Sequence, residues 1–173
     1  MNSIIFTTAL RFLGLVFFQG LLLQRFQLGG PILGHLFVIM FPVFIMLLPL
    51  RTPRPLLIFL GFLIGLAIDL FYDSPGLHAS AGAFTGYFRK FPLKWLAPRG
   101  GYNVNYSPTV RRYGWNWFLK YSALMLGAHL FFYFCVEAFT FAFYVDILLN
   151  FLISFPVSML FIIMFQRIFE PLD

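Results

Sequence analysis

The chain has 173 residues, of which 61% are hydrophobic and 10% are charged, and it carries a formal net charge of +6. Soluble domains are about one quarter charged, so this composition excludes the soluble globular class. The mean hydropathy of +0.87 indicates instead that lipid surrounds most of the chain. A surplus of lysine and arginine in such a protein marks its orientation, and no aromatic stacking motif accompanies it, so we do not expect nucleic-acid binding.

A helix needs about 20 apolar residues to cross the hydrocarbon core of a bilayer. In chain order, the apolar runs predict six transmembrane helices, at residues 4–23, 32–50, 56–72, 77–96, 117–139 and 147–169. A connector at 51–55 separates the second span from the third, because its two prolines have no amide to donate. A tight turn at 73–76 precedes the fourth span, and a basic loop at 97–116 precedes the fifth. We predict one all-α membrane domain over residues 1–173.

Two boundaries stay open in the sequence. The last third of the fourth run contains Arg89 and further basic residues, so residues 92–96 either span the bilayer or lie in its interface. The segment 140–146 is itself apolar, so the limit between the fifth and sixth spans is not fixed.

The basic residues sort to one side of the membrane if the N-terminus is cytoplasmic. With six spans, most basic residues then lie on the cytoplasmic side. They are Arg51, Arg54, Arg89, Lys90, Lys94, Arg99, Arg111, Arg112, Lys120 and Arg167. Arg25 falls outside, whereas Asp69, Asp73, Glu137 and Asp146 lie at or near the outer ends of the spans. We therefore predict that both termini are cytoplasmic.

Two polar residues interrupt the first span, where an ionisable group at the bilayer midplane costs at least about 2.5–3.5 kcal/mol. Arg11 and Gln19 share one helical face. They either contact another subunit or a neighbouring helix, or form an internal polar contact from which Arg11 reaches toward the cytoplasm.

The third span carries Gly61, Gly65 and Asp69 at intervals of four, close to one face of the helix. Glycines remove side-chain bulk and allow another backbone to approach closely. We therefore predict a closely packed helix junction that contains a polar group.

An acidic outer cluster with a histidine is formed by Asp73, His78, Glu137 and Asp146, and His129 shares a face of the fifth span with Glu137. Such groups can bind a metal or relay protons. The plainer interpretation is that they begin and end helices, since no two have a compact ligand spacing. We predict no metal site, no cofactor and no catalytic residue, because no hydrolytic triad, phosphate-binding glycine loop or zinc motif occurs in the sequence.

Residues 65–71 (GLAIDLF) followed by 74–79 (SPGLHA) resemble the rod shape-determining protein MreD family. The similarity continues through Phe88-Arg89, 97–100, 117–118, His129 and 134–139 around Glu137. Arg11, Gln19 and Leu48-Pro49 also fit, so the resemblance covers most of the chain. Its most specific part is the acidic end of the third span with the Gly76-Leu77-His78-Ala79 turn.

This resemblance implies a six-helix subunit of the bacterial cell-elongation machinery in the inner membrane, with no reaction of its own. Its expected partners are an MreC-type periplasm-facing protein, a SEDS-type glycan polymerase with its transpeptidase, the MreB-type actin-like filament indirectly, and membrane lipid. The implied fold is similar to the substrate-binding subunits of energy-coupling-factor vitamin transporters. The candidates for helix packing or interaction are Arg11, Gln19, Gly61, Gly65, Asp69, Gly76, His78, Arg89, His129 and Glu137.

Our main hypothesis is a non-enzymatic membrane scaffold for peptidoglycan synthesis that maintains rod shape. The alternative is a small-molecule (vitamin-like) binding subunit of a membrane transporter, which needs an outer pocket lined by Asp69, His78 and Glu137. A third interpretation is a proton or metal conductor that uses the outer acidic cluster.

Overall fold

The computed structural model describes residues 2–26 and 33–169. Every element of regular structure in these residues is helical. In chain order they are α1 (Asn2–Phe17), continued by a π-helical turn (Phe18–Leu22) and a 3-10 turn (Leu23–Phe26), a 3-10 turn (Leu33–His35), α2 (Pro42–Met46), α3 (Arg54–Tyr72), α4 (Leu77–Phe88), α5 (Lys90–Trp95), α6 (Val110–Ala138), a 3-10 turn (Phe141–Phe143) and α7 (Tyr144–Phe169). The prediction of an all-α chain is confirmed for the described residues.

Four helical segments are long and apolar enough to cross a membrane, and they coincide with the first, third, fifth and sixth predicted spans. They are Phe6–Arg25, Arg54–Tyr72, Val110–Ala138 and Tyr144–Phe169. Their outer surfaces carry large apolar side chains, such as Phe6 at 71% and Leu70 at 79% exposure. Water solvates such a surface poorly, so the fold is that of an α-helical membrane protein.

The second predicted span is wrong as a continuous helix. Residue 32, where it was expected to begin, lies outside the described residues. Beyond the turn Leu33–His35 the backbone has no regular structure until α2, which contains only 5 residues. Pro42 occupies the start of α2 and has no amide that could bond back to the carbonyl of Val38. Proline suits this first position of a helix, where an amide would have no partner within the helix.

The fourth predicted span is divided into α4 and α5 at Arg89. Pro92 lacks the amide that would bond the carbonyl of Phe88, which explains the break. A short helical turn at residues 110–113 lies within the predicted basic loop, and the non-helical Gly114 (φ 79°, ψ 166°) separates it from the long part of α6. The boundary left open between the last two spans is now defined by the end of α6 and the start of α7.

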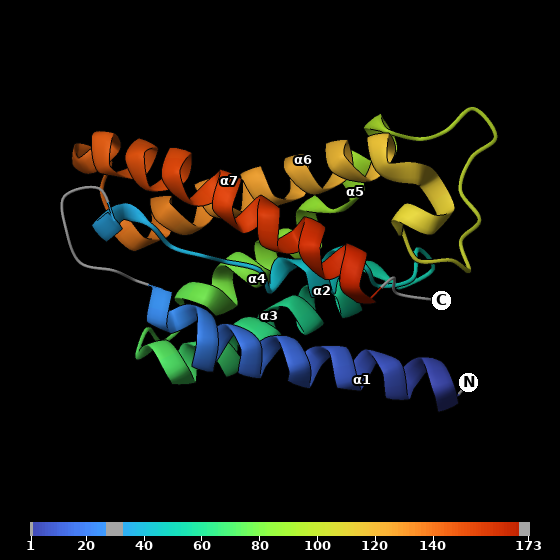
Figure 1. Cartoon of the computed structure of the whole chain (residues 1–173), viewed down its shortest axis with the longest axis horizontal. Helices are drawn as coiled ribbons and strands as arrows, with labels where there is room; N and C mark the ends of the chain where they lie inside the picture. The colour runs from blue at the N-terminus through green and yellow to red at the C-terminus, as the bar shows by residue number, and fades with distance from the viewer. Residues whose placement is uncertain (1, 27–32, 170–173) are drawn as a thin grey trace.

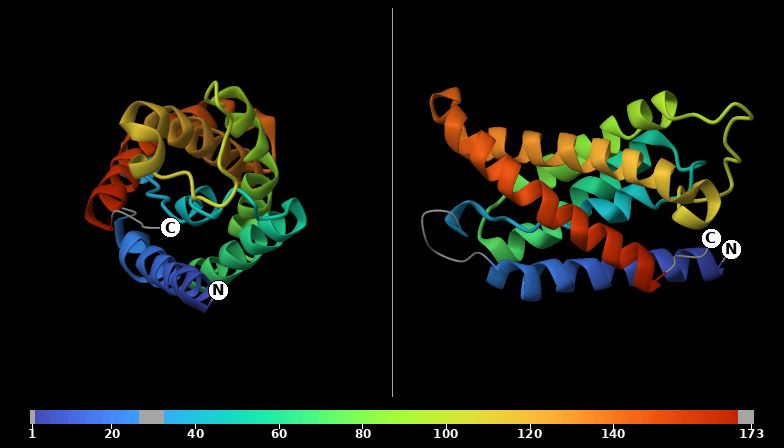
Figure 2. Two further views of the ribbon diagram at one scale, coloured as in Figure 1. Left: turned by 90° about the vertical axis from the view of Figure 1, so that its right-hand side faces the viewer. Right: turned by 45° about the horizontal axis from the view of Figure 1, so that its top comes forward.

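The long helices surround the segment 33–50, which runs through the middle of the molecule (Figures 1 and 2). α1 runs from one end of the molecule to the other, and the segment 33–50 runs back toward the first end. α3 and then α4 with α5 make the next pair of passages, followed by α6 and α7 (Figure 1). The start of α1 and the end of α7 therefore lie at the same end. Residues 38–48 of the central segment are all buried.

Four glycines allow α3 and α4 to pack backbone against backbone. A Cβ atom added to Gly61 would overlap the carbonyl of Gly82, and one added to Gly65 would overlap the carbonyl of His78. Gly86 meets the carbonyl of Leu57 in the same way. The face predicted from Gly61 and Gly65 is thus the face that contacts α4, and any side chain there must push two backbones apart.

We expect Gly65→Leu to lower the free energy of unfolding by about 3 kcal/mol or more, because the overlapping atoms are backbone and cannot rotate away. The measurement is thermal unfolding of the purified protein in detergent. Gly14→Leu is the matched control, since nothing lies within 4 Å of a Cβ at Gly14. Equal losses of stability in the two variants would contradict the close-packing argument.

Candidate functional site

Residues 36–41 of the central segment are not helical, so their peptide groups need hydrogen-bond partners from elsewhere. Two serines of α7 supply them. The amide of Phe37 donates to Ser154 Oγ at 2.9 Å, and the amide of Ile39 donates to Ser158 Oγ at 2.9 Å. Each hydroxyl donates in turn, Ser154 to the carbonyl of His35 and Ser158 to that of Phe37. Four residues of helix rise about 6.0 Å and two of extended chain about 6.6 Å, so the two spacings match.

Gln19 lies in the π-helical turn that continues α1, and its side chain bonds the same central segment. Its Nε2 donates to the carbonyl of Val38 at 2.8 Å, and its Oε1 accepts from the amide of Met40 at 2.8 Å. The side-chain amide thus satisfies one carbonyl and one amide of the segment, as a neighbouring strand would. The Tyr72 hydroxyl, 3.1 Å from Nε2, joins α3 to this contact.

Arg89, at the break between α4 and α5, is 1% exposed and holds the end of α2. Its Nε donates to the Tyr121 hydroxyl at 3.2 Å, and its Nη2 donates to the carbonyls of Met46 and Leu48. Tyr121 donates to the carbonyl of Met46 at 3.2 Å. Carbonyls at a helix end carry partial negative charge, so an arginine is well suited to them.

Asp69, 3% exposed, accepts hydrogen bonds around the start of α4. Oδ1 accepts from the amide of His78 at 2.9 Å and from Ser74 Oγ at 3.1 Å, and it lies 2.8 Å from His78 Nδ1. Oδ2 accepts from the amides of Gly76 at 2.9 Å and Ala79 at 3.1 Å. These amides have no partner within the helix, and an anion is favoured at their end of it. The carboxylate therefore fixes the turn between α3 and α4.

Two buried histidines leave one ring nitrogen each without a partner among the described residues. The Thr85 hydroxyl donates to the carbonyl of Ala81, so it accepts from His129 Nδ1 at 2.6 Å. Nδ1 of His78 is directed at Asp69 and Nδ1 of His129 at Thr85, which leaves Nε2 of each ring without a partner in the part of the chain that the structure describes. Both Nε2 atoms lie in the interior, where an unpaired polar atom is costly.

The structure separates the other predicted residues from this interior. Arg11 is half-buried on α1, whereas Asp73, Glu137 and Asp146 are exposed. The predicted outer cluster is therefore divided, because His78 is 1% exposed and lies against Asp69. Among the described residues, no group of three histidine, cysteine or acidic side chains is placed to hold a metal ion.

Sequence reasoning missed the residues that bond the central segment from α7 and α6. Ser154 and Ser158 stand four positions apart in an otherwise apolar run, which was a visible signal. The role of Tyr121 had no such signal, because aromatic residues are frequent throughout the chain and at membrane interfaces.

No family model, no curated protein and no solved structure matches this chain.

We expect the pair Ser154→Ala and Ser158→Ala to destabilise the protein by about 2–4 kcal/mol, since two buried amides lose their acceptors. Thermal unfolding in detergent measures the change. Ser122→Ala is the control, because Ser122 is equally buried but donates to the carbonyls of Phe118 and Leu119 in its own helix. A loss no greater than in the control would refute the role given to the serine pair.

Asp69→Asn is expected to lower stability by about 2 kcal/mol or more, although the two side chains have the same shape. The NH₂ group of the asparagine would face backbone amides that donate to a carboxylate oxygen in the parent protein. Asp73→Asn serves as the comparison, since Asp73 is exposed with φ of 49°, a conformation that asparagine tolerates. Unfolding curves that coincide for the two variants would rule out the capping role of Asp69.

Proposed function

We propose that the chain crosses the bacterial inner membrane six times, with both termini in the cytoplasm. The second crossing is made by the central segment and the fourth by α4 with α5. Two observations support this topology: successive elements run in opposite directions, and the start of α1 and the end of α7 share one end with the loop before α6 (Figure 1). That loop and its flanks contain Arg99, Arg111 and Arg112, and basic residues favour the cytoplasmic side.

The proposed function is a non-enzymatic scaffold of the cell-elongation complex that maintains rod shape, as a member of the MreD family. One observation carries most weight beside the sequence resemblance: five polar side chains inside the bundle, those of Gln19, Asp69, Arg89, Ser154 and Ser158, bond its own backbone. Gln19, Arg89 and the α7 serines bond the central segment, and Asp69 bonds the start of α4. Such an interior favours a rigid body on which partners assemble.

The partners proposed from the resemblance are an MreC-type protein and a SEDS-type polymerase with its transpeptidase, with an indirect link to an MreB-type filament. The exposed apolar faces of α1, α3 and α7 are broad enough to contact other membrane helices as well as lipid. A fold like that of the energy-coupling-factor substrate subunits is part of the same proposal.

A small-molecule binding subunit is the second candidate, and the two bare histidine nitrogens favour it. A ligand with O–H or N–H donors could satisfy Nε2 of His78 and of His129. Against it, both oxygens of Asp69 are engaged with α4, and Glu137 is exposed at the end of α6. Asp69 and His78 of the predicted outer pocket are therefore buried together, whereas Glu137 is exposed.

Depletion of the protein from a rod-shaped host is expected to produce round cells, because wall insertion along the cylinder would lose its organiser. The measurement is cell width together with fluorescent labelling of new wall. Complementation by Gly14→Leu should restore rods, whereas Gly65→Leu should not. Depleted cells that keep their shape and labelling pattern would refute the scaffold.

Affinity purification in mild detergent separates the two candidates. A scaffold retains the elongation proteins in amounts close to its own. Retention of a stoichiometric vitamin-like compound without those proteins would instead establish the transporter subunit.

A further inference from the structure

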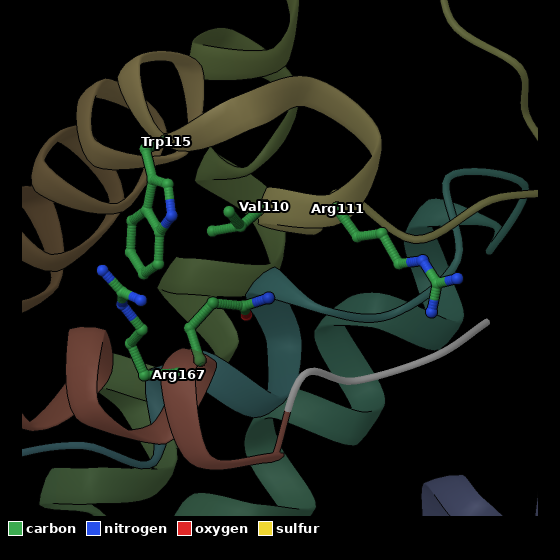
Figure 3. Close-up of a pocket in the computed structure, with 5 residues that line it drawn as sticks. Val110, Arg111, Trp115 and Arg167 are labelled. Carbon is green, nitrogen blue, oxygen red and sulfur yellow. The ribbon is translucent and has the colours of Figure 1, made fainter.

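An open pocket lies where α6 begins and α7 ends (Figure 3). Its volume is about 210 Å³, and the residues that line it are Val110, Arg111, Trp115, Gln166 and Arg167. Both helices are long and apolar enough to cross a membrane, and the arginines and the tryptophan at this end are typical of the headgroup region. A molecule in this pocket would therefore sit at headgroup depth.

Two arginines line the pocket. The Arg167 guanidinium lies over the Trp115 indole, with its central carbon 5.0 Å from the ring centroid. Arg111 stands on the other side of Val110, and its guanidinium points away from Trp115 (Figure 3). Both arginines are exposed, and the described lining residues include no carboxylate. Basic pockets between helix ends bind anionic headgroups, and tryptophan is frequent at that depth.

Gln166 adds a second, independent requirement. The residue is only 2% exposed, and its Oε1 has no hydrogen-bond partner in the described part of the chain. An amide oxygen needs a donor, and a phosphodiester group alone brings none. The occupant that satisfies the whole pocket therefore combines a negative charge with a hydroxyl donor.

We propose that this pocket binds the headgroup of an anionic phospholipid that carries hydroxyl groups, of the phosphatidylglycerol class. The phosphate lies beside Arg167, within the positive field of Arg111, and a headgroup hydroxyl donates to Gln166 Oε1. Phosphatidylcholine lacks both features, since its headgroup has no donor and no net charge. The site goes beyond the proposed scaffold function, and a binding assay on the purified protein tests it independently of cell shape.

The test titrates the full chain, purified in detergent, with short-chain phosphatidylglycerol and short-chain phosphatidylcholine, and reads bound lipid by native mass spectrometry. We expect the glycerol lipid to bind about tenfold more tightly, as for a charge-assisted contact with a second hydrogen bond. Gln166→Met should remove most of this preference without changing the charge, and Arg167→Gln should weaken binding of the glycerol lipid. Arg99→Gln, an exposed arginine of the loop, should have no effect.

Three results would overturn the proposal. Equal affinities for the two lipids would remove the headgroup specificity, and an equal loss in Arg99→Gln would assign binding to general surface charge. Full displacement of the lipid by inorganic phosphate at the same concentration would assign the pocket to free phosphate. Size-exclusion profiles of the variants that match the parent protein exclude misfolding as the cause of a loss.

Discussion

The structure depends on one constraint: the peptide groups of the central segment must find hydrogen-bond partners where water is absent. An unsatisfied backbone group in hydrocarbon costs several kcal/mol, so irregular backbone at that depth persists only inside protein. Here the partners come from several helices, with Gln19 on the first passage, Ser154 and Ser158 on α7, and Arg89 and Tyr121 at the end of α2. The surrounding helices are thereby tied to a common centre.

The same contacts explain why Gln19, Ser154 and Ser158 lie inside the bundle. Each replaces a bond that a regular helix would make for itself. Asp69 follows this logic at the turn between α3 and α4, and the glycines of that pair bring the two backbones close enough for the carboxylate to reach the first amides of α4. Close packing and polar capping therefore depend on each other at this junction.

The sequence predicted side-chain properties better than backbone conformation. The packing face of Gly61 and Gly65 was predictable, because four-residue spacing puts both on one face of any helix. The run 32–50 was misjudged, because hydropathy sums side chains and is the same for a helix and for an extended buried segment. Pro42 was a visible signal of a helix start. The hydrogen bonds that stabilise this non-helical segment come from α7, more than 100 positions later in the chain, and no local sequence pattern predicts them.

A scaffold and an uptake subunit make opposite demands on such an interior. An uptake subunit must open to admit its ligand, and opening beside Asp69 would strip the first amides of α4 of their acceptor. Each bond lost there costs about 1 kcal/mol or more, so a ligand would have to supply several of them to be admitted. The bare nitrogens of His78 and His129 could offset only part of that cost. These free-energy costs favour a protein that keeps one conformation and contacts its partners through its outer surface.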